Sequence, residues 1–387
     1  MAHCRASSDF VVVGARSKLY VFNSSQEVAH VLDLEELVNQ VSPQAKGSCP
    51  SSADKQVLGC AFSPSGSLCC VLTWAKLAFV FECRNGWIQH GASPIRLPKA
   101  PTAVTFDNDE KHVIVSDRAG NVNRFELEKK EYAEGTKWQD INGEEQDMPL
   151  DPLLGHISII LDMCLSPDGK FLLTGDRDEK LRIARYPQSY SISHFCLGHS
   201  SYVKSIQVLD NLVFTSGGDS TIRVWDLLSG ETVAVSDRLD ELAVRFIRAF
   251  RAPQENTITI SVAFEKCGTI KSLKYDVESK TFGDITSKKI QEDSIFDLAY
   301  APDGTLFVLT TSTFGLVSDS GEFSPIAAPD DFAESLKESA DPLGKLEKVV
   351  AFNNMDEYLE RKEQRIRKRK HAGDEAAEVA SECPDLL

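Results

Sequence analysis

Two stretches of the chain repeat one pattern. Residues 155–183 read GHISIILDMCLSPDGKFLLTGDRDEKLRI, and residues 198–226 read GHSSYVKSIQVLDNLVFTSGGDSTIRVWD. They begin 43 residues apart, and each contains apolar strands separated by turns. A period of about 40–45 residues that opens with Gly-His and closes with Trp-Asp is typical of a WD-repeat propeller blade. The pair therefore predicts a β-propeller.

Weaker copies of this pattern lie on both sides of the pair. Each combines an apolar strand, a turn containing Pro, Gly, Asn or Asp, and a second apolar strand. Together with the pair they predict six blades, near residues 57–83, 101–127, 159–186, 202–228, 245–276 and 294–319.

The two ends of the propeller predict a seventh, closing blade. Residues 9–23 have a strand-turn-strand pattern without an opening half, and residues 340–353 contain a lone apolar strand. Joined, they would close the ring and leave no open sheet edge. We therefore expect an all-β, seven-bladed WD-repeat propeller over residues 1–353, followed by a basic helix and a disordered tail over residues 354–387.

Composition places the chain among ordinary globular proteins. Its 387 residues are 42% hydrophobic and 26% charged, with a net charge of −16. No apolar run reaches the roughly 18 residues of a membrane helix or forms a signal-peptide core. The ten cysteines are scattered and none forms C-x-x-C. We therefore expect an intracellular protein without a membrane segment, whose cysteines are buried small residues rather than disulfides or metal ligands.

The repeat assigns structural roles to its polar residues. In WD repeats the His, a strand Ser or Thr, a turn Asp and the Trp form a buried hydrogen-bond chain. Such a chain gives each buried polar group a partner. The corresponding residues here are His199, Thr215, Asp219 and Trp225.

The preceding copy is incomplete. His156, Thr174 and Asp178 fit the pattern, but Ala184 stands where the Trp belongs. His156 and His199 are accordingly expected to be core histidines rather than catalytic bases or metal ligands.

Two insertions interrupt the repeats. Residues 126–151 contain nine acidic and three basic residues without apolar periodicity, and residues 41–55 are rich in Ser, Pro, Ala and Gly. We expect solvated loops at both places. A binding role for either loop stays open as an alternative.

A basic segment follows the last blade. Residues 361–370 carry a net charge of +6, which leaves −22 on the rest of the chain. The spacing of Asn354 and Glu357 predicts a helix that begins near Met355. Phosphate binding and nuclear import both suit the basic end, and a solvated tail is the alternative. The basic residues are Arg361, Lys362, Arg365, Arg367, Lys368, Arg369 and Lys370.

One turn carries charges that the repeat does not require. Residues 175–182 read GDRDEKLR, whereas the equivalent residues 216–223 read SGGDSTIR. Arg177, Glu179 and Lys180 have no counterpart in the second turn. Fixed charges of both signs at a propeller rim are suited to selecting and orienting a partner. An ordinary charged hairpin is the alternative.

Motifs for catalysis are absent from the sequence. It contains no G-x-G-x-x-G after a strand, no P-loop, no H-E-x-x-H and no G-x-S-x-G. A propeller carrying about −22 also repels nucleic-acid phosphates except near its basic tail. The sequence therefore predicts a binding protein without catalytic or metal-ligating residues.

Residues 165–183, followed by Phe195–His199, resemble the non-catalytic WD-repeat subunit of the eukaryotic tRNA (guanine-N7) methyltransferase. The string D-R-D-E-K-L-R at residues 176–182 is the most specific part of this resemblance. Residues 358–365, which read YLERKEQR, resemble a C-terminal segment of the same family.

The resemblance implies a heterodimer and no cofactor on this chain. The catalytic partner would hold S-adenosylmethionine and methylate a guanosine in the tRNA variable loop, while the propeller binds, stabilises and orients it. Contact with tRNA would come mainly through the complex, with the basic segment near the partner or the tRNA. A nuclear location fits, with a cytoplasmic pool as an alternative. Carried over by motif, the residues at or behind the partner interface are Asp176, Arg177, Asp178, Glu179, Lys180 and Arg182.

Two other classes stay open. A ubiquitin-ligase substrate receptor would bind an adaptor through a blade rim, and a reader of histone tails or other peptides would use the central channel.

Overall fold

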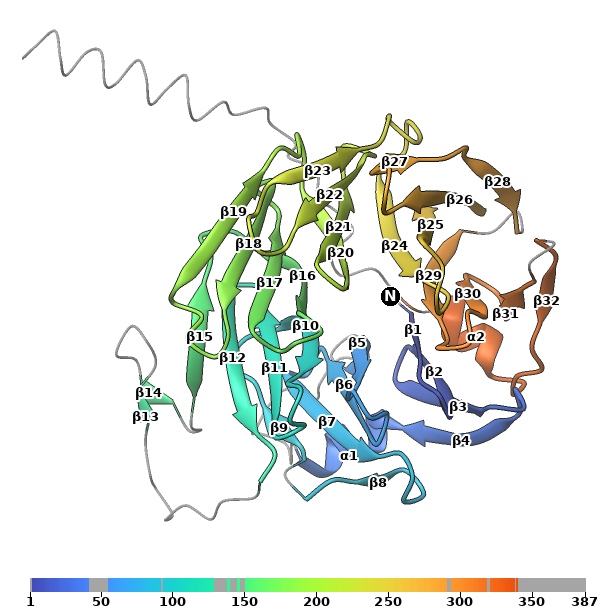
Figure 1. Cartoon of the computed structure of the whole chain (residues 1–387). Helices are drawn as coiled ribbons and strands as arrows, with labels where there is room; N and C mark the ends of the chain where they lie inside the picture. The colour runs from blue at the N-terminus through green and yellow to red at the C-terminus, as the bar shows by residue number, and fades with distance from the viewer. Residues whose placement is uncertain are drawn as a thin grey trace, which may run out of the picture. The chain divides into compact units, whose positions relative to one another are not determined.

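The computed structural model describes the propeller and leaves out several connecting segments. In its larger compact unit, residues 1–344, seven antiparallel sheets of four or five strands surround a common axis (Figure 1). The predicted seven-bladed β-propeller is confirmed. The predicted basic helix and tail lie outside the described residues. Described are residues 2–41, 55–91, 93–128, 138–139, 145–146, 150–290, 294–318, 321–337 and 339.

Each blade is one sheet whose first three strands pair in chain order, and we number the blades along the chain. Blades one to four consist of β1 (His3–Ala6), β2 (Phe10–Ala15), β3 (Lys18–Asn23) and β4 (Val28–Asp33); β5 (Val57–Phe62), β6 (Leu68–Thr73), β7 (Leu77–Glu82), β8 (Ile88–Gln89) and β9 (Ile95–Arg96); β10 (Pro101–Phe106), β11 (His112–Asp117), β12 (Asn121–Glu126) and β15 (Asp151–Gly155); and β16 (Ile160–Leu165), β17 (Phe171–Asp176), β18 (Lys180–Arg185) and β19 (Ile192–Leu197).

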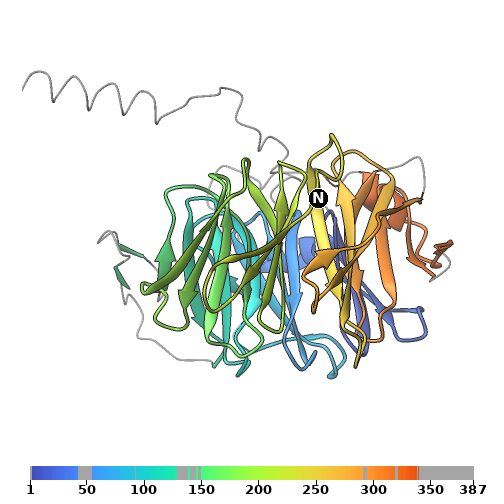
Figure 2. The same ribbon diagram turned by 45° about the horizontal axis from the view of Figure 1, so that its top comes forward.

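Blades five to seven complete the ring, and Figure 2 shows the blades standing side by side between two rims. They consist of β20 (Val203–Leu209), β21 (Leu212–Gly217), β22 (Ile222–Asp226) and β23 (Thr232–Val235); β24 (Val244–Phe250), β25 (Thr257–Phe264), β26 (Thr269–Asp276), β27 (Thr281–Phe282) and β28 (Thr286–Lys289); and β29 (Ile295–Tyr300), β30 (Leu306–Thr310), β31 (Phe314–Val317) and β32 (Phe323–Pro325).

The outer strand of each blade was missing from the six predicted ranges. Those ranges cover the three inner strands, which are apolar and largely buried. The outer strands face solvent on one side and carry few buried residues, as β19 and β32 illustrate. Without an apolar run to mark them, they resembled connecting loops.

The prediction for the closing blade is wrong about the source of its strands. Residues 9–23 are completed by β1 and β4, so blade one is a whole sheet within residues 3–33. Residues 340–353 lie outside the described part of the chain, which ends at Ser339. The sequence HCRA of β1 lacks an apolar pattern because this strand faces the centre of the ring, where the Arg5 guanidinium lies 2.7 Å from Asp297 of blade seven.

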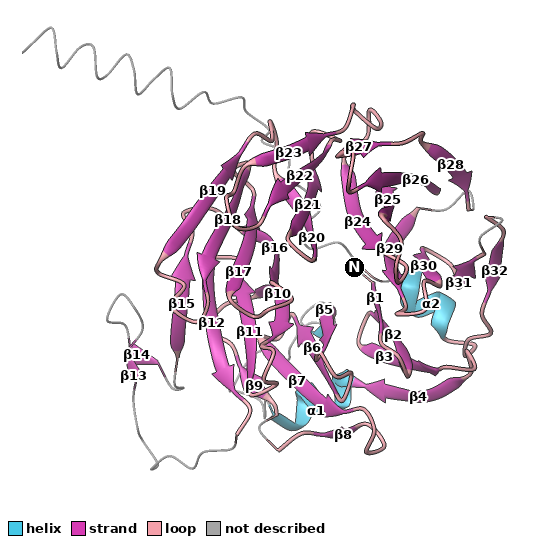
Figure 3. Cartoon of the chain, viewed as in Figure 1, coloured by secondary structure: helices cyan, strands magenta, loops and turns pink. Residues whose placement is uncertain are grey.

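Two short α-helices cover the blade-one region (Figure 3). Helix α1 (Leu34–Val41) buries Leu34 and Val38 in the core shared by blades one and two. Helix α2 (Phe332–Lys337) follows blade seven and returns to blade one. There the Tyr20 and Ser335 hydroxyls are 2.9 Å apart. In the part of the chain that the structure describes, side-chain packing thus joins the two ends of the ring.

The two insertions lie partly within the described residues. The acidic insertion leaves β12 at Glu126 and returns at β15. It contains a short antiparallel pair that the sequence did not predict, formed by β13 (Trp138–Gln139) and β14 (Glu145–Gln146). Most of the 41–55 loop lies outside the described residues.

Candidate partner-binding surface

Blade five contains the complete hydrogen-bond chain of the repeat. The His199 Nδ1–H donates to Asp219 (2.8 Å), and the Thr215 hydroxyl lies 2.8 Å from His199 Nε2. The Trp225 indole N–H donates to the same hydroxyl (2.8 Å). Burial alone would raise the pKa of Asp219, but the hydrogen bond and charge of His199 outweigh burial and lower it to about 2. These groups stabilise the blade and are occupied with one another.

In blade four the acidic partner of the histidine is not the predicted one. The His156 Nδ1–H donates to Asp176 (3.0 Å), and the Thr174 hydroxyl lies 2.9 Å from Nε2. The assignment of Asp178 to this role was wrong. Asp176 ends β17 at the position where Gly217 ends β21, so its carboxylate reaches the histidine two residues earlier.

The charged turn between β17 and β18 is built on Asp176. Its second carboxylate oxygen accepts the backbone N–H of Asp178 (2.9 Å) and of Lys180 (3.0 Å). The Lys180 ammonium donates to the Asp178 carbonyl (3.1 Å), and Glu179 adopts a positive φ of 73° at the tip. Arg177, Asp178, Glu179 and Lys180 are half-buried, so each keeps accessible surface at the rim. Asp176, by contrast, is 2% exposed and holds the turn from below.

Arg182 lies behind this turn and is 7% exposed. Its guanidinium donates to the carbonyls of Gly155 and Ser189, both at 3.1 Å. Burial lowers the pKa of Arg182 below its ordinary value. An arginine always remains charged in proteins, so this side chain ties blade three to the β18–β19 turn as a cation. Its position supports the turn and offers little surface to a partner.

Apolar side chains that have no part in the sequence prediction border the charged turn. In the β18–β19 register, Leu197 lies opposite Lys180 and Phe195 lies opposite Arg182. Leu197 is 65% exposed and Phe195 is 49% exposed. The signal available in the sequence was Phe195-Cys196-Leu197, whose alternation places Cys196 inside and its two neighbours outside.

The loop before blade four adds another exposed apolar residue. The backbone N–H of Arg177 donates to the Ile159 carbonyl (3.0 Å), which holds this loop beside the charged turn. Ile157, two residues earlier, is fully exposed. We define the blade-four surface as Ile157, Arg177, Asp178, Glu179, Lys180, Phe195 and Leu197.

Three further features of the sequence prediction are metal sites, membrane helices and the basic segment. Within the described residues, no cluster of three or more His, Cys, Asp or Glu side chains could hold a metal ion. In that same part of the chain no helix is long and apolar enough to span a membrane. The basic residues from Arg361 to Lys370 lie outside the described residues.

Comparison with known proteins gives one consistent result. Residues 123–307 match the family model described as the tRNA methyltransferase TRM82 WD40 domain. A Caenorhabditis elegans protein named tRNA (guanine-N(7)-)-methyltransferase non-catalytic subunit is 35% identical over 69% of this chain. A Mus musculus protein of the same name, WDR4, is 30% identical over 59% of this chain. The chain spans 63% and 52% of the lengths of these two relatives.

A solved structure agrees on the fold. A chain of the mitotic checkpoint complex aligns with a TM-score of 0.60 at 16% identity, covering 84% of this chain and 90% of that one. At this identity the likeness concerns the fold alone. The family model and the two relatives confirm the resemblance that the sequence predicted.

Proposed function

We propose that this chain, a relative of the WD-repeat non-catalytic subunits of tRNA (guanine-N7) methyltransferase, binds such a catalytic subunit and orients it for methylation of a variable-loop guanosine in tRNA. The observation that carries the proposal is the blade-four surface. It sets a turn with charges of both signs beside three exposed apolar side chains, within the stretch that most resembles the family.

The composition of this surface suits a specific protein interface. Exposed apolar residues supply the area that drives association, whereas the charged turn penalises wrongly oriented partners. Phe195 and Leu197 project from a sheet, and Asp176 and Arg182 brace the turn through buried hydrogen bonds. A surface held this rigidly loses little conformational entropy when a partner binds.

Positioning is the whole contribution that we assign to this chain. The catalytic partner would hold S-adenosylmethionine and perform the transfer, and the propeller would fix its conformation and its register on tRNA. Correct alignment of reacting groups alone is worth several kcal/mol of a reaction barrier. In this proposal no residue of this chain takes part in the methyl transfer.

Reconstitution tests the proposal. The full chain is mixed with the candidate guanine-N7 methyltransferase of the same organism, and methyl transfer to tRNA is compared with each protein alone. We expect a one-to-one complex on sizing and activity that depends on both proteins. Absence of a complex, with activity of the candidate unchanged, would refute the proposal.

Two substitutions locate the interface. Lys180→Glu reverses a charge on the turn, and Leu197→Ser removes an exposed apolar side chain; we expect each to weaken the complex by about tenfold or more. Ile88→Ser is the matched control, because Ile88 is 50% exposed on the outer strand β8 of blade two. If all three variants bind the partner alike, the interface lies elsewhere.

The basic segment has a separate part in the proposal. We propose that Arg361 to Lys370 attract tRNA phosphates and support nuclear localisation. Deleting residues 361–387 should leave assembly intact while weakening tRNA binding and flattening its salt dependence. If the salt dependence of tRNA binding is unchanged, the segment does not contribute to tRNA binding. A tagged full chain that stays outside the nucleus would contradict the localisation.

A further inference from the structure

The inner strands of six blades share an irregularity that redirects one side chain each. In β5, β10, β16, β20, β24 and β29, the pairing with the second strand skips the second residue. Such a bulge aims its side chain differently from its neighbours. The skipped residues are Leu58, Thr102, Leu161, Lys204, Arg245 and Phe296, and the first four line a cavity at the centre of the ring.

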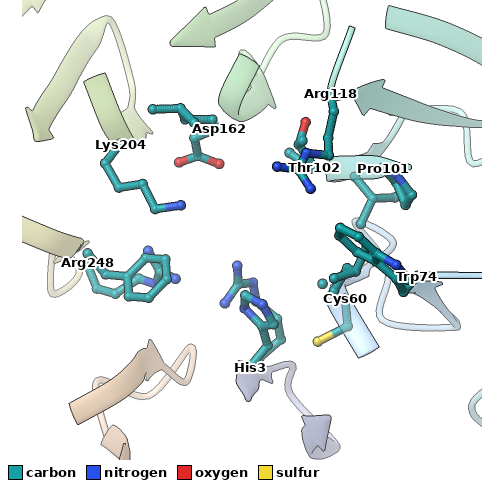
Figure 4. A pocket seen from close by; sticks show the side chains of 16 residues that line it. His3, Cys60, Trp74, Pro101, Thr102, Arg118, Asp162, Lys204 and Arg248 are labelled. Carbon is teal, nitrogen blue, oxygen red and sulfur yellow. The ribbon is translucent and has the colours of Figure 1, made fainter. Parts of the chain in front are cut away.

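This central cavity is bounded by residues from six blades and has a volume of about 60 Å³. On this measure a water molecule needs about 10–15 Å³, so the space suits several waters or one small oxyanion. Figure 4 shows Lys204, Arg248 and His3 around the space, with Arg118 and Trp74 on the far side. Trp74 and Phe246 provide apolar walls.

The charge in the cavity is opposite to that of the chain. Four cationic side chains line it, against the single carboxylate of Asp162. Two of the four, Arg5 and Arg248, share the buried carboxylate of Asp297, each at 2.7 Å. With both carboxylates counted, the surroundings are positive, although the whole chain carries −16. A lining that is mainly of one sign, with low-dielectric walls, concentrates its field on a small counter-ion.

His3 faces this space without a full set of partners. It is 7% exposed, its Nδ1 lies 3.5 Å from Asp297, and among the described residues Nε2 has no hydrogen-bond partner. Burial lowers the pKa of His3 to about 4, so the ring is neutral at pH 7 and carries one N–H. Buried polar groups in proteins are nearly always hydrogen-bonded, and an unused ring nitrogen beside a cationic cavity indicates a ligand.

We propose that the central cavity binds an oxyanion, a phosphate or carboxylate group, between Lys204, Arg118 and His3. Lys204 and Arg118 supply charge-assisted hydrogen bonds from opposite sides. A bound anion favours the protonated imidazole, which donates from Nε2 to the anion while its Nδ1–H faces Asp297. The Asp162 carboxylate at the edge of the cavity already accepts the backbone N–H of Ile206 (2.8 Å) and of Met163 (2.9 Å). The site is separate from the blade-four surface and does not depend on the proposed function.

Inorganic phosphate is the first probe. The full chain is titrated with phosphate and, separately, with acetate at constant ionic strength, with chloride as the reference and the melting temperature as the readout. We expect a saturable rise with at least one of the two anions, and the stronger response identifies phosphate or carboxylate as the preferred group. No saturable rise with either anion would overturn the proposal.

Variants localise the effect. Lys204→Met should weaken the apparent affinity about tenfold or more, Arg118→Gln should weaken it several-fold, and Lys204→Arg should retain it. Lys274→Met is the matched control, because it removes the same charge from an exposed position of β26. Melting of each variant without added anion checks folding. Equal affinities in Lys204→Met, Arg118→Gln and Lys274→Met would overturn the proposal.

A crystal soaked in selenate gives an answer that does not depend on stability. Selenate has the shape of phosphate, and its anomalous signal marks its position. We expect a peak within hydrogen-bond distance of Lys204, Arg118 and His3. Selenate bound only at other places would count against the site.

Discussion

Blades four and five open with the same Gly-His pair but use their polar residues differently. In blade five, His199, Asp219, Thr215 and Trp225 form a closed hydrogen-bond chain. In blade four the hydrogen-bond chain ends at the threonine. Ala184 takes the position of the tryptophan and packs among aliphatic side chains. The difference teaches that one repeat carries its distinctive residues in its interior and the other at its rim. A blade can therefore keep its stability while its turn is adapted to a partner.

The largest expected effect concerns the buried tryptophan that blade five has and blade four lacks. Trp225→Ala should lower the free energy of unfolding by about 3–5 kcal/mol, because a fully buried side chain leaves a cavity. Trp225→Phe should cost only about 1 kcal/mol for the lost hydrogen bond to Thr215. Urea unfolding measures both. Similar losses for the two variants would show that the hydrogen bond, rather than packing, makes the tryptophan important.

The next effect concerns the support behind the blade-four turn. Arg182→Leu should lower the free energy of unfolding by about 2–3 kcal/mol, because the carbonyls of Gly155 and Ser189 lose their donor. Arg185→Leu is the control, since Arg185 is exposed at the end of the same strand. If Arg182→Leu abolishes partner binding without loss of stability, Arg182 contacts the partner directly.

Acid should affect blade five through Asp219. Its pKa of about 2 lies below the ordinary value of 3.8, so its stabilising contribution is present above about pH 4 and is lost as the pH falls toward 2. At about 1.4 kcal/mol per pKa unit, this shift corresponds to about 2.5 kcal/mol. Urea unfolding at several pH values should show a shallower dependence between pH 4 and 2 for Asp219→Asn. An identical slope in the variant would disprove this assignment.

The smallest effect distinguishes backbone from side chain at the turn. Glu179 holds a positive φ of 73°, which glycine adopts without steric cost. Glu179→Gly should therefore change the free energy of unfolding by less than about 1 kcal/mol, in the stabilising direction. If the Glu179 carboxylate contacts the partner, the same variant weakens the complex. A clear loss of stability would show that the side chain supports the fold.

The repeat was readable where packing leaves a pattern in the sequence. Inner strands such as β17 and β21 each begin with three apolar residues after a turn, and the 43-residue spacing connected them. The polar strand β1 was missed because Asp297, the partner of Arg5, lies 292 residues away in the chain. Long-range ion pairs leave no local periodicity.

The sequence predicted which charged residues form the candidate surface, but not which of them are buried behind it. Arg177, Glu179 and Lys180 stood out because the neighbouring repeat lacks them. Sequence alone did not reveal that Arg182 points into the protein or that Asp176 replaces Asp178, since both depend on which carbonyl or histidine lies within reach. The apolar border of the turn required the strand register of β18 and β19.

The self-contained first blade affects how the chain folds during synthesis. All strands of blade one lie within residues 3–33, and every later blade likewise takes its strands from one continuous stretch of the chain. A chain leaving the ribosome can therefore complete each sheet from residues already made, without holding an unpaired strand until the end. The last event is the docking of blade seven and α2 against blade one, where Asp297 meets Arg5. Closure of the ring is thus a late step that joins finished sheets.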